Sequence, residues 1–307
     1  MISIIVPTYN EDENIKKLYL EVKKILLHLN EKYEFIVIDN NSSDDTIKVL
    51  REIAKDDKNF KVILNSRNFG HIRSPFYALK FAKGECVVCL AGDFEDPPEL
   101  LKNFLELWKK GHKVVMARKK NKKAGIFTKI FKNYYYKLLK KFSNLDLPIH
   151  TTGMGLYDKS IIKDLLKLQD PYPYFRAMIS EITDKIKYVD FEKPSRKYGV
   201  SKNNIFTLYD MGISAFIKYT NFPMRLLVYF GFLLSVISLL ISILFFLYKI
   251  LYWNSFEVGI APLVIGVFLI FSFLILILGI IGEYLIEIIK QIRNVPLVFE
   301  EERINFD

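Results

Sequence analysis

Residues 87–99 read VVCLAGDFEDPPE, and this stretch decides the fold class. Its apolar first half is typical of a buried strand, which ends at Gly92. Three carboxylates follow within four residues, those of Asp93, Glu95 and Asp96. Carboxylates just past the carboxyl end of a buried parallel strand lie where open α/β sheets bind ligands, and hard oxygen ligands suit Mg²⁺ or Mn²⁺. The alternative is a polar strand-to-helix turn without a ligand.

Strand-like and helix-like segments alternate on both sides of this stretch. Apolar, β-branched runs predict strands at 2–7, 34–39, 61–64, 87–90 and 114–116. Helices are expected between them, at about 10–28, after 44, around 75–82 and at 98–109. This alternation predicts a doubly wound α/β sheet with mostly parallel strands. The sequence lacks a glycine-rich phosphate loop, which excludes an ordinary dinucleotide-binding domain.

Two long uncharged runs lie near the end of the 307-residue chain, at 226–248 and 258–282. Each exceeds the roughly 20 residues that span a bilayer. Buried core helices would explain one such run more readily than two in tandem. We therefore expect a transmembrane hairpin.

Basic residues flank this hairpin on its outer sides, at Lys218, Arg225, Lys290 and Arg293, and the connecting loop 249–257 is nearly neutral. The positive-inside rule then predicts a multi-pass cell-membrane protein whose N-terminal domain and C-terminal tail are cytoplasmic. No signal peptide is expected, because Met1 leads directly into a strand-like run.

Two basic, aromatic-rich segments, Ile126 to Phe142 and Ile205 to Tyr219, have apolar residues near helical spacing. We interpret them as membrane-surface helices, with ordinary packing on the sheet as the alternative for the first. The predicted divisions are a catalytic domain (1–204), a juxtamembrane segment (205–225), the hairpin (226–282) and a tail (283–307).

The net charge and the two cysteines limit the kinds of partner and cofactor that are expected. The net charge of +10 fits an anionic lipid surface, and no nucleic-acid recognition motif is present, so no nucleic-acid partner is expected. Cys86 and Cys89 form a lone C-x-x-C inside an apolar strand, which indicates reduced core residues and not a metal or redox site.

Three separated stretches, PTYNE at 7–11, DNNSSD at 39–44 and DFEDPPE at 93–99, resemble the motifs of family 2 glycosyltransferases. The chain is most similar to the polyprenyl-phosphate glycosyltransferases, such as dolichol-phosphate mannose synthase and the undecaprenyl-phosphate glucosyl transferases. The segment RNFGH at 67–71, the Arg196 to Lys202 stretch and the two-span hairpin also fit this resemblance.

The resemblance implies a GT-A fold, a nucleotide-diphosphate sugar donor, a polyprenyl phosphate acceptor and inverting, metal-assisted transfer. By position, Pro7, Tyr9 and Glu11 would line the nucleotide, and Asp39 would hydrogen-bond its base. Asp93 matches the metal-binding acid of the D-x-D motif. For Pro7, Tyr9 and Asp39 the alternative is turn and capping chemistry.

The chain departs from the family pattern at two places. Ala91 replaces the first acid of D-x-D, and Glu95 stands where relatives have Gln, so Glu95 could restore the lost charge as a second catalytic and metal-binding residue. The stretch TGMGL at 152–156 lacks the acid and arginine of G-D-F-R-L. The basic candidates for the lipid phosphate or donor diphosphate are Arg118, Arg196 and Lys202; their alternative is a solvated surface charge.

These residues are compatible with three functions. The favoured one is attack of a lipid phosphate oxygen on the anomeric carbon of the nucleotide sugar, because a phosphate is already anionic and needs little help from a base. A non-catalytic membrane adaptor would explain Ala91. A transferase for a growing polysaccharide would need a general base and further acceptor motifs. The sugar, the nucleotide, the lipid length and any homo-oligomer are left undecided.

Overall fold

The computed structural model describes residues 1–94, 96–120, 134, 137, 141–143, 148, 151–168, 170–192, 216, 217, 220, 222–252, 260–293 and 295–306. The chain forms two compact units. The first consists of Met1–Lys140, Asn144–Asn203 and Asn294–Asp307, and the second of Lys141–Ser143 and Asn204–Arg293.

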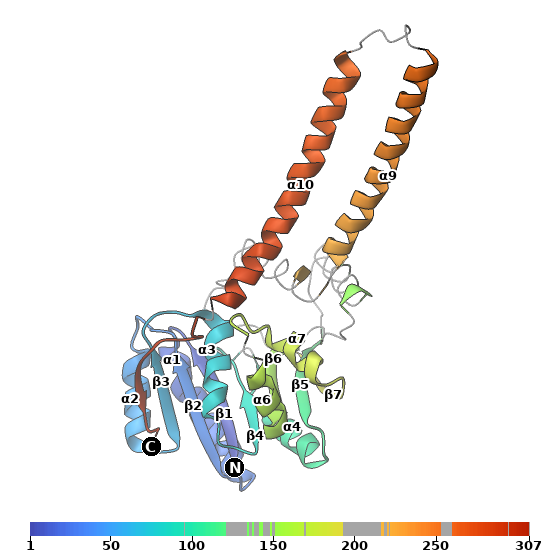
Figure 1. The fold of residues 1–307 in the computed structure, drawn as a ribbon. Coiled ribbons are helices and arrows are strands. Elements are labelled where there is room, and N and C mark those ends of the chain that lie inside the picture. Colours follow the sequence, from blue (N-terminus) through green and yellow to red (C-terminus); the bar gives the residue numbers. More distant parts are fainter. Residues whose placement is uncertain are drawn as a thin grey trace. The chain divides into compact units, whose positions relative to one another are not determined.

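The first unit is built on an eight-stranded sheet with the order β7-β5-β6-β4-β1-β2-β3-β8 (Figure 1). The bounds are β1 Ile2–Thr8, β2 Tyr33–Asp39, β3 Phe60–Asn65, β4 Cys86–Cys89, β5 Val114–Lys119, β6 Thr151–Asp158, β7 Ile186–Phe191 and β8 Glu300–Ile304. Only β6 and β8 run antiparallel to their neighbours. The prediction of a mostly parallel α/β sheet is confirmed, but β6, β7 and β8 were not predicted.

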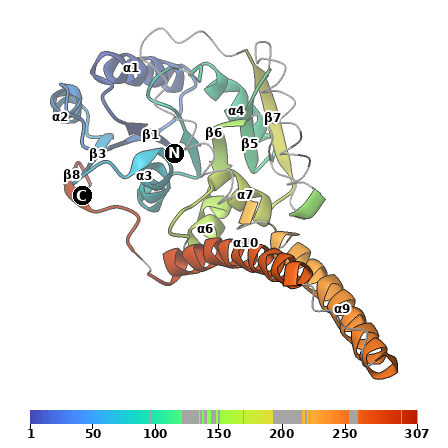
Figure 2. The same ribbon diagram turned by 90° about the horizontal axis from the view of Figure 1, so that it is seen from above.

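Helices cover both faces of the sheet (Figure 2). One face carries α1 Asp12–His28, α2 Thr46–Asp56 and α4 Leu100–Lys109. The other carries α3 Gly70–Ala78, the 3₁₀ turn η1 Leu79–Phe81, α6 Lys159–Lys167 and α7 Phe175–Ile182. Strands enclosed in this way are mostly apolar, and every residue of β2 is buried, including Glu34 and Asp39. Helix α3 begins at Gly70, earlier than the predicted start near Pro75.

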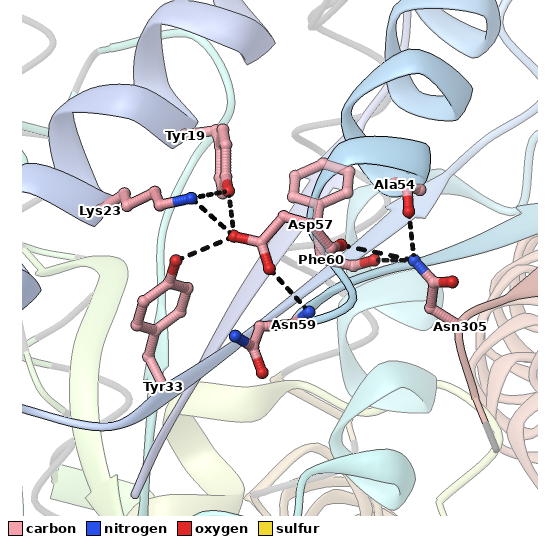
Figure 3. Close-up of polar contacts among 8 residues, drawn as sticks. All are labelled: Tyr19, Lys23, Tyr33, Ala54, Asp57, Asn59, Phe60 and Asn305. Atoms are coloured by element: carbon pink, nitrogen blue, oxygen red, sulfur yellow. Dashed lines mark hydrogen bonds and ion pairs between the residues drawn. The ribbon is translucent and has the colours of Figure 1, made fainter.

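A polar network fixes the edge of the sheet where the parallel strands begin (Figure 3). Asp57, just after α2, accepts hydrogen bonds from Tyr19 (2.5 Å), Lys23 (2.7 Å) and Tyr33 (3.1 Å). Burial alone would raise the pKa of Asp57, but these bonds and one from the Asn59 amide hold it well below its usual range. The network therefore joins α1, α2 and β2 at the edge opposite the motif residues.

The second unit contains two long helices, α9 Phe222–Leu251 and α10 Ile260–Ile292, which contact each other. Large apolar side chains lie exposed on both, including Phe232 (72% exposed) and Ile275 (68%). Within the described residues, no helix is both long enough and apolar enough to cross a membrane.

Candidate functional site

Three parallel strands bring the sequence motifs to one edge of the sheet. Thr8 at the end of β1 lies opposite Asp39 at the end of β2, and Ile5 lies opposite Cys89 at the end of β4. The next residue, Leu90, donates a 2.9 Å backbone hydrogen bond to Ile5. The three motifs thus leave the sheet at neighbouring carboxyl ends, the position where open α/β sheets bind ligands.

Asp39 is fully buried at this edge. Its Oδ1 accepts from the Ser42 amide at 2.9 Å, and its Oδ2 accepts from the Ser42 hydroxyl at 2.5 Å and the Thr8 hydroxyl at 3.1 Å. Burial raises the pKa of Asp39, and the bonds from Ser42 and Thr8 oppose that rise. The carboxylate is therefore oriented by Thr8 on β1 and by Ser42 in the loop after β2.

The first two motifs lock together through side chain-to-backbone bonds. The Asn10 amide donates to Ser42 Oγ at 2.9 Å, and the Ser43 amide donates back to Asn10 Oδ1 at 2.9 Å. The Glu11 amide donates to Thr46 Oγ1 at 2.9 Å. Asn10 has a φ of 56° and Asn41 a φ of 59°, in the left-handed region that Asn tolerates better than most residues. These bonds join the two loops into one platform.

The carboxylate stretch after β4 packs onto this platform. A Cβ at Gly92 would lie 3.2 Å from the Pro7 carbonyl oxygen and 3.6 Å from Glu11 Cγ, so the glycine allows the turn before Asp93 to approach the first motif closely. Phe94 has a φ of 55°, which is unusual for a bulky residue and typical of strained functional turns. The turn before Asp93 therefore lies against the first motif at Pro7 and Glu11.

A further loop, residues 66–69, borders the site on the β3 side. Asn40 Oδ1 accepts three hydrogen bonds, from Asn65 Nδ2 at 3.0 Å, Ser74 Oγ at 2.5 Å and the Phe69 amide at 3.2 Å. Asn40 directly follows Asp39 and is buried. Asn40 was not predicted as a site residue, although its place beside Asp39 in the second motif was a usable signal.

The oxygen ligands at this edge suit a hard divalent cation. Among the described residues, which do not include Glu95, no group of three His, Cys, Asp or Glu side chains is arranged to hold a metal ion. Asp93 nevertheless follows a turn packed against Glu11, and carboxylate oxygens are the donors that Mg²⁺ and Mn²⁺ prefer. The donor chemistry therefore fits such an ion, with Asp93 as the described ligand candidate.

Some of the other predicted site residues are described by the structure, and others lie outside the described residues. Pro7, Tyr9 and Glu11 are half-buried at the shared edge. Arg118 pairs with Asp190 on β7 at 2.7 Å, an ion pair across neighbouring strands. Arg196 and Lys202 lie outside the described residues, as do Glu95, the Ile205 segment up to residue 215 and most of the Ile126 segment.

Arg176, a cation that was not predicted as a site residue, contacts the first residue of β6 near this edge. Cys89 pairs with Gly155, so Thr151 at the start of β6 extends past the end of β4. Arg176 on α7 donates a 3.1 Å hydrogen bond to the Thr151 carbonyl. No local pattern marks Arg176, because its position depends on the antiparallel pairing of β6.

Both thiols lie on β4, where Cys86 is buried and Cys89 is half-buried. Cys86 and Cys89 form no disulfide with each other, and burial raises the pKa of each to about 12. Both are therefore protonated at neutral pH, which makes them poor nucleophiles and metal ligands.

The comparison with known proteins identifies the family. The profile of the family described as "Glycosyl transferase family 2" matches residues 3–166. The chain belongs to this family. It is accordingly a glycosyltransferase that uses nucleotide sugars, as the motifs predicted.

Relatives match this family 2 chain over nearly its whole length. The uncharacterized glycosyltransferase YkcC of Bacillus subtilis (strain 168) is 31% identical over 296 residues, which cover 96% of this chain and 91% of YkcC. The SfII prophage-derived bactoprenol glucosyl transferase of Shigella flexneri is 23% identical over 96% of both chains.

A solved structure shares the fold. It is that of glucosyl-3-phosphoglycerate synthase from Mycobacterium tuberculosis in complex with Mn²⁺, uridine diphosphate and phosphoglyceric acid. The TM-score is 0.50 at 18% identity, with 71% of this chain and 78% of the other covered. The α/β GT-A-like fold predicted from the sequence is thus confirmed.

Proposed function

We propose that this family 2 enzyme transfers a sugar from a nucleotide-diphosphate sugar to a polyprenyl phosphate at the cytoplasmic face of the cell membrane. The observation that carries the proposal is the match, over 96% of both chains, to a bactoprenol glucosyl transferase. It extends beyond the transferase domain into the two uncharged runs.

The donor nucleotide binds the platform formed by the first two motifs. Pro7, Tyr9 and Glu11 line the nucleotide, and the Asp39 carboxylate accepts a hydrogen bond from its base. The three bonds that Asp39 receives from Thr8 and Ser42 support this role, because they orient the carboxylate before the base arrives.

The donor diphosphate lies against the turn after β4. Asp93 and Glu95 are the residues that would hold Mg²⁺ or Mn²⁺, which neutralises negative charge on a diphosphate leaving group when bound. Support comes from the solved relative, which holds Mn²⁺ and uridine diphosphate. Ala91 leaves Asp93 without the first acid of the motif, and Glu95 replaces its charge.

The reaction forms one bond and breaks one. An oxygen of the lipid phosphate attacks the anomeric carbon, the bond from that carbon to the β-phosphate oxygen breaks, and the nucleoside diphosphate leaves with the electron pair. Configuration inverts. The attacking oxygen carries no proton at neutral pH, so the missing acid in the 152–156 stretch is tolerated. Arg118, Arg196 and Lys202 are the candidates to bind phosphate; Arg118 would have to leave Asp190.

The acceptor requires contact with a lipid bilayer. The uncharged runs 226–248 and 258–282, partly outside the described residues, form the membrane hairpin of this proposal. Their basic flanks support a cytoplasmic location for the transferase domain and the tail. The exposed apolar side chains on α9 and α10 support burial in lipid.

One assay tests this function. Membranes containing the protein are incubated with a panel of radiolabelled nucleotide sugars, with and without added undecaprenyl phosphate, and the extracted lipid is analysed. We expect label in a lipid that needs both the phosphate acceptor and a divalent cation, and none with Asp93→Asn. Label in polysaccharide without a lipid intermediate would overturn the acceptor, and no transfer from any donor would favour the adaptor.

A further inference from the structure

The C-terminal residues return to the first unit and complete its sheet. Strand β8 pairs antiparallel with β3, with Val62 opposite Ile304 and Asn65 opposite Glu300. Because β3 ends at the motif edge, the two ends of this C-terminal segment lie at opposite edges of the sheet. Residues 297–299 lie at the motif edge, and Asn305 and Phe306 lie at the other.

At the motif edge the segment holds the 66–69 loop from outside. The Phe299 carbonyl accepts from the Ser66 amide at 2.9 Å and from the Ser66 hydroxyl at 3.0 Å. The Phe299 ring lies 6.1 Å from the Phe69 ring. Arg73 on α3 donates to the Pro296 carbonyl at 2.7 Å, and its guanidinium lies 5.4 Å from the Phe69 ring.

Burial anchors this end of the segment. Leu297 and Val298 are 9% and 4% exposed and pack in the core beneath α3, together with Phe69 and Phe76. The 66–69 loop is thus held on two sides. The C-terminal segment holds it from outside, and Asn40 holds the Phe69 amide from inside.

From these contacts we propose that Leu297, Val298 and Phe299 are positioning residues for donor binding. They fix the 66–69 loop, and through it Asn40 and the neighbouring Asp39, in the geometry that receives the nucleotide. This inference rests on the donor site of the proposed function. Its physical basis is preorganisation: a loop already ordered in the free protein loses less entropy when the ligand binds.

The opposite end of the same segment provides a matched control. Asn305 Nδ2 donates to the Ala54 and Phe60 carbonyls at 2.7 and 2.8 Å (Figure 3). The Phe306 ring lies 5.5 Å from that of Phe81. These contacts also anchor the segment, but at the edge away from the motifs.

The experiment compares two double variants of the full chain, Leu297→Ala/Val298→Ala and Asn305→Ala/Phe306→Ala. Melting temperature, the dissociation constants of uridine and guanosine diphosphate with Mn²⁺, and donor KM and kcat are measured. Both variants should melt at a lower temperature. Only the first should weaken nucleotide binding and raise donor KM, by roughly three- to tenfold, with kcat within about twofold of the parent.

A milder variant covers the case in which the first double variant does not fold. Ser66→Ala removes one exposed hydrogen bond to Phe299 and should raise the same dissociation constant by about two- to threefold. Two results would overturn the inference, provided that Asp39→Ala still weakens nucleotide binding. One is unchanged nucleotide affinity in the Leu297→Ala/Val298→Ala and Ser66→Ala variants. The other is an equal loss of nucleotide affinity in the Asn305→Ala/Phe306→Ala control. If the parent binds neither nucleotide, or Asp39→Ala binds normally, the donor site itself is wrong and both proposals fall.

Discussion

Thr8 Oγ1 donates a 3.1 Å hydrogen bond to Asp39 Oδ2, which joins the ends of β1 and β2 where their motifs begin. Strand register already places these two residues opposite each other. The bond uses one oxygen of a carboxylate that is buried and whose pKa is raised, mainly by burial. The bonds from Thr8 and Ser42 use three of the roughly four acceptor positions of a carboxylate, and the proposed function assigns a further bond to the nucleotide base.

Asp39→Ala tests that assignment directly. The change removes a buried, charge-assisted hydrogen bond worth about 1.5–3 kcal/mol, so donor affinity should fall by roughly tenfold to a hundredfold. Isothermal titration calorimetry with a nucleoside diphosphate measures the loss, and the melting temperature checks that the protein is folded. Affinity equal to that of the parent would place the base elsewhere.

Asp93→Asn should abolish sugar transfer and leave folding intact, because it removes charge at nearly constant volume. Glu95→Gln should also lower activity, since Glu95 compensates for the acid missing at Ala91. Initial rates of lipid glycosylation across a Mn²⁺ titration measure both effects. A neutral Glu95→Gln together with a marked gain for Ala91→Asp would show that compensation does not occur.

The sequence was sufficient to predict those site residues whose positions follow from local patterns and from the topology of the sheet. Residues at the ends of parallel strands share an edge, so Pro7, Asp39 and Asp93 could be grouped before their contacts were known. Sequence could not pair Arg118 with Asp190, because that ion pair depends on β7, a strand that was not predicted.

Strand β8 was missed for a different reason. Its residues 300–304, EEERI, carry four charges, which is common in edge strands and atypical of the apolar runs that signal a strand. Its partner β3 lies more than two hundred residues earlier in the chain, so no local signal could pair them. The tail therefore looked like an independent segment in the sequence.

Asp57→Ala should lower the free energy of unfolding by about 2–3 kcal/mol, because Lys23, Tyr19 and Tyr33 lose their shared acceptor (Figure 3). Asp56→Ala, at an exposed neighbouring position, is the matched control and should stay within about 0.5 kcal/mol of the parent. Donor affinity of the folded protein should be unchanged in both.

The Asp57 carboxylate should make the free energy of unfolding decrease as the pH falls into the acid range. The pKa of Asp57 is lower in the folded protein than its ordinary value, so its contribution is complete above that ordinary value, near pH 4, and is lost as the pH falls further. Urea unfolding from pH 7 down to pH 3 should therefore show the parent and Asp57→Ala converging in acid. A constant difference across that range would contradict the role of its charge.

Cysteine labelling tests the orientation of the proposed hairpin. Ser255→Cys, in the connecting loop, should react with an impermeant maleimide from outside intact cells, and Glu301→Cys, exposed on β8, should react only after lysis. The native Cys86 and Cys89 should give little background, because burial raises the pKa of both to about 12. The reverse labelling pattern would invert the topology.

Replacing the hairpin separates membrane attachment from donor binding. Simple truncation at residue 221 would also delete β8, so residues 222–293 are instead exchanged for a flexible linker of about 20 residues, with a root-mean-square span of about 25 Å. Residues 295–306 then remain available to pair with β3. Nucleoside diphosphate affinity should match the parent, whereas transfer to polyprenyl phosphate in membranes should fall at least tenfold, since the hairpin supplies a high local concentration of enzyme at the lipid surface.

The truncation at residue 221 is the informative comparison for this exchange. It should lose nucleotide affinity as well as transfer, because residues 297–299 no longer hold Ser66 and Phe69. Equal nucleotide affinity in the two proteins would mean that the C-terminal segment does not act on the donor site. Full transfer to membrane-embedded lipid by the linker variant would instead refute the hairpin as the element that brings enzyme and acceptor together.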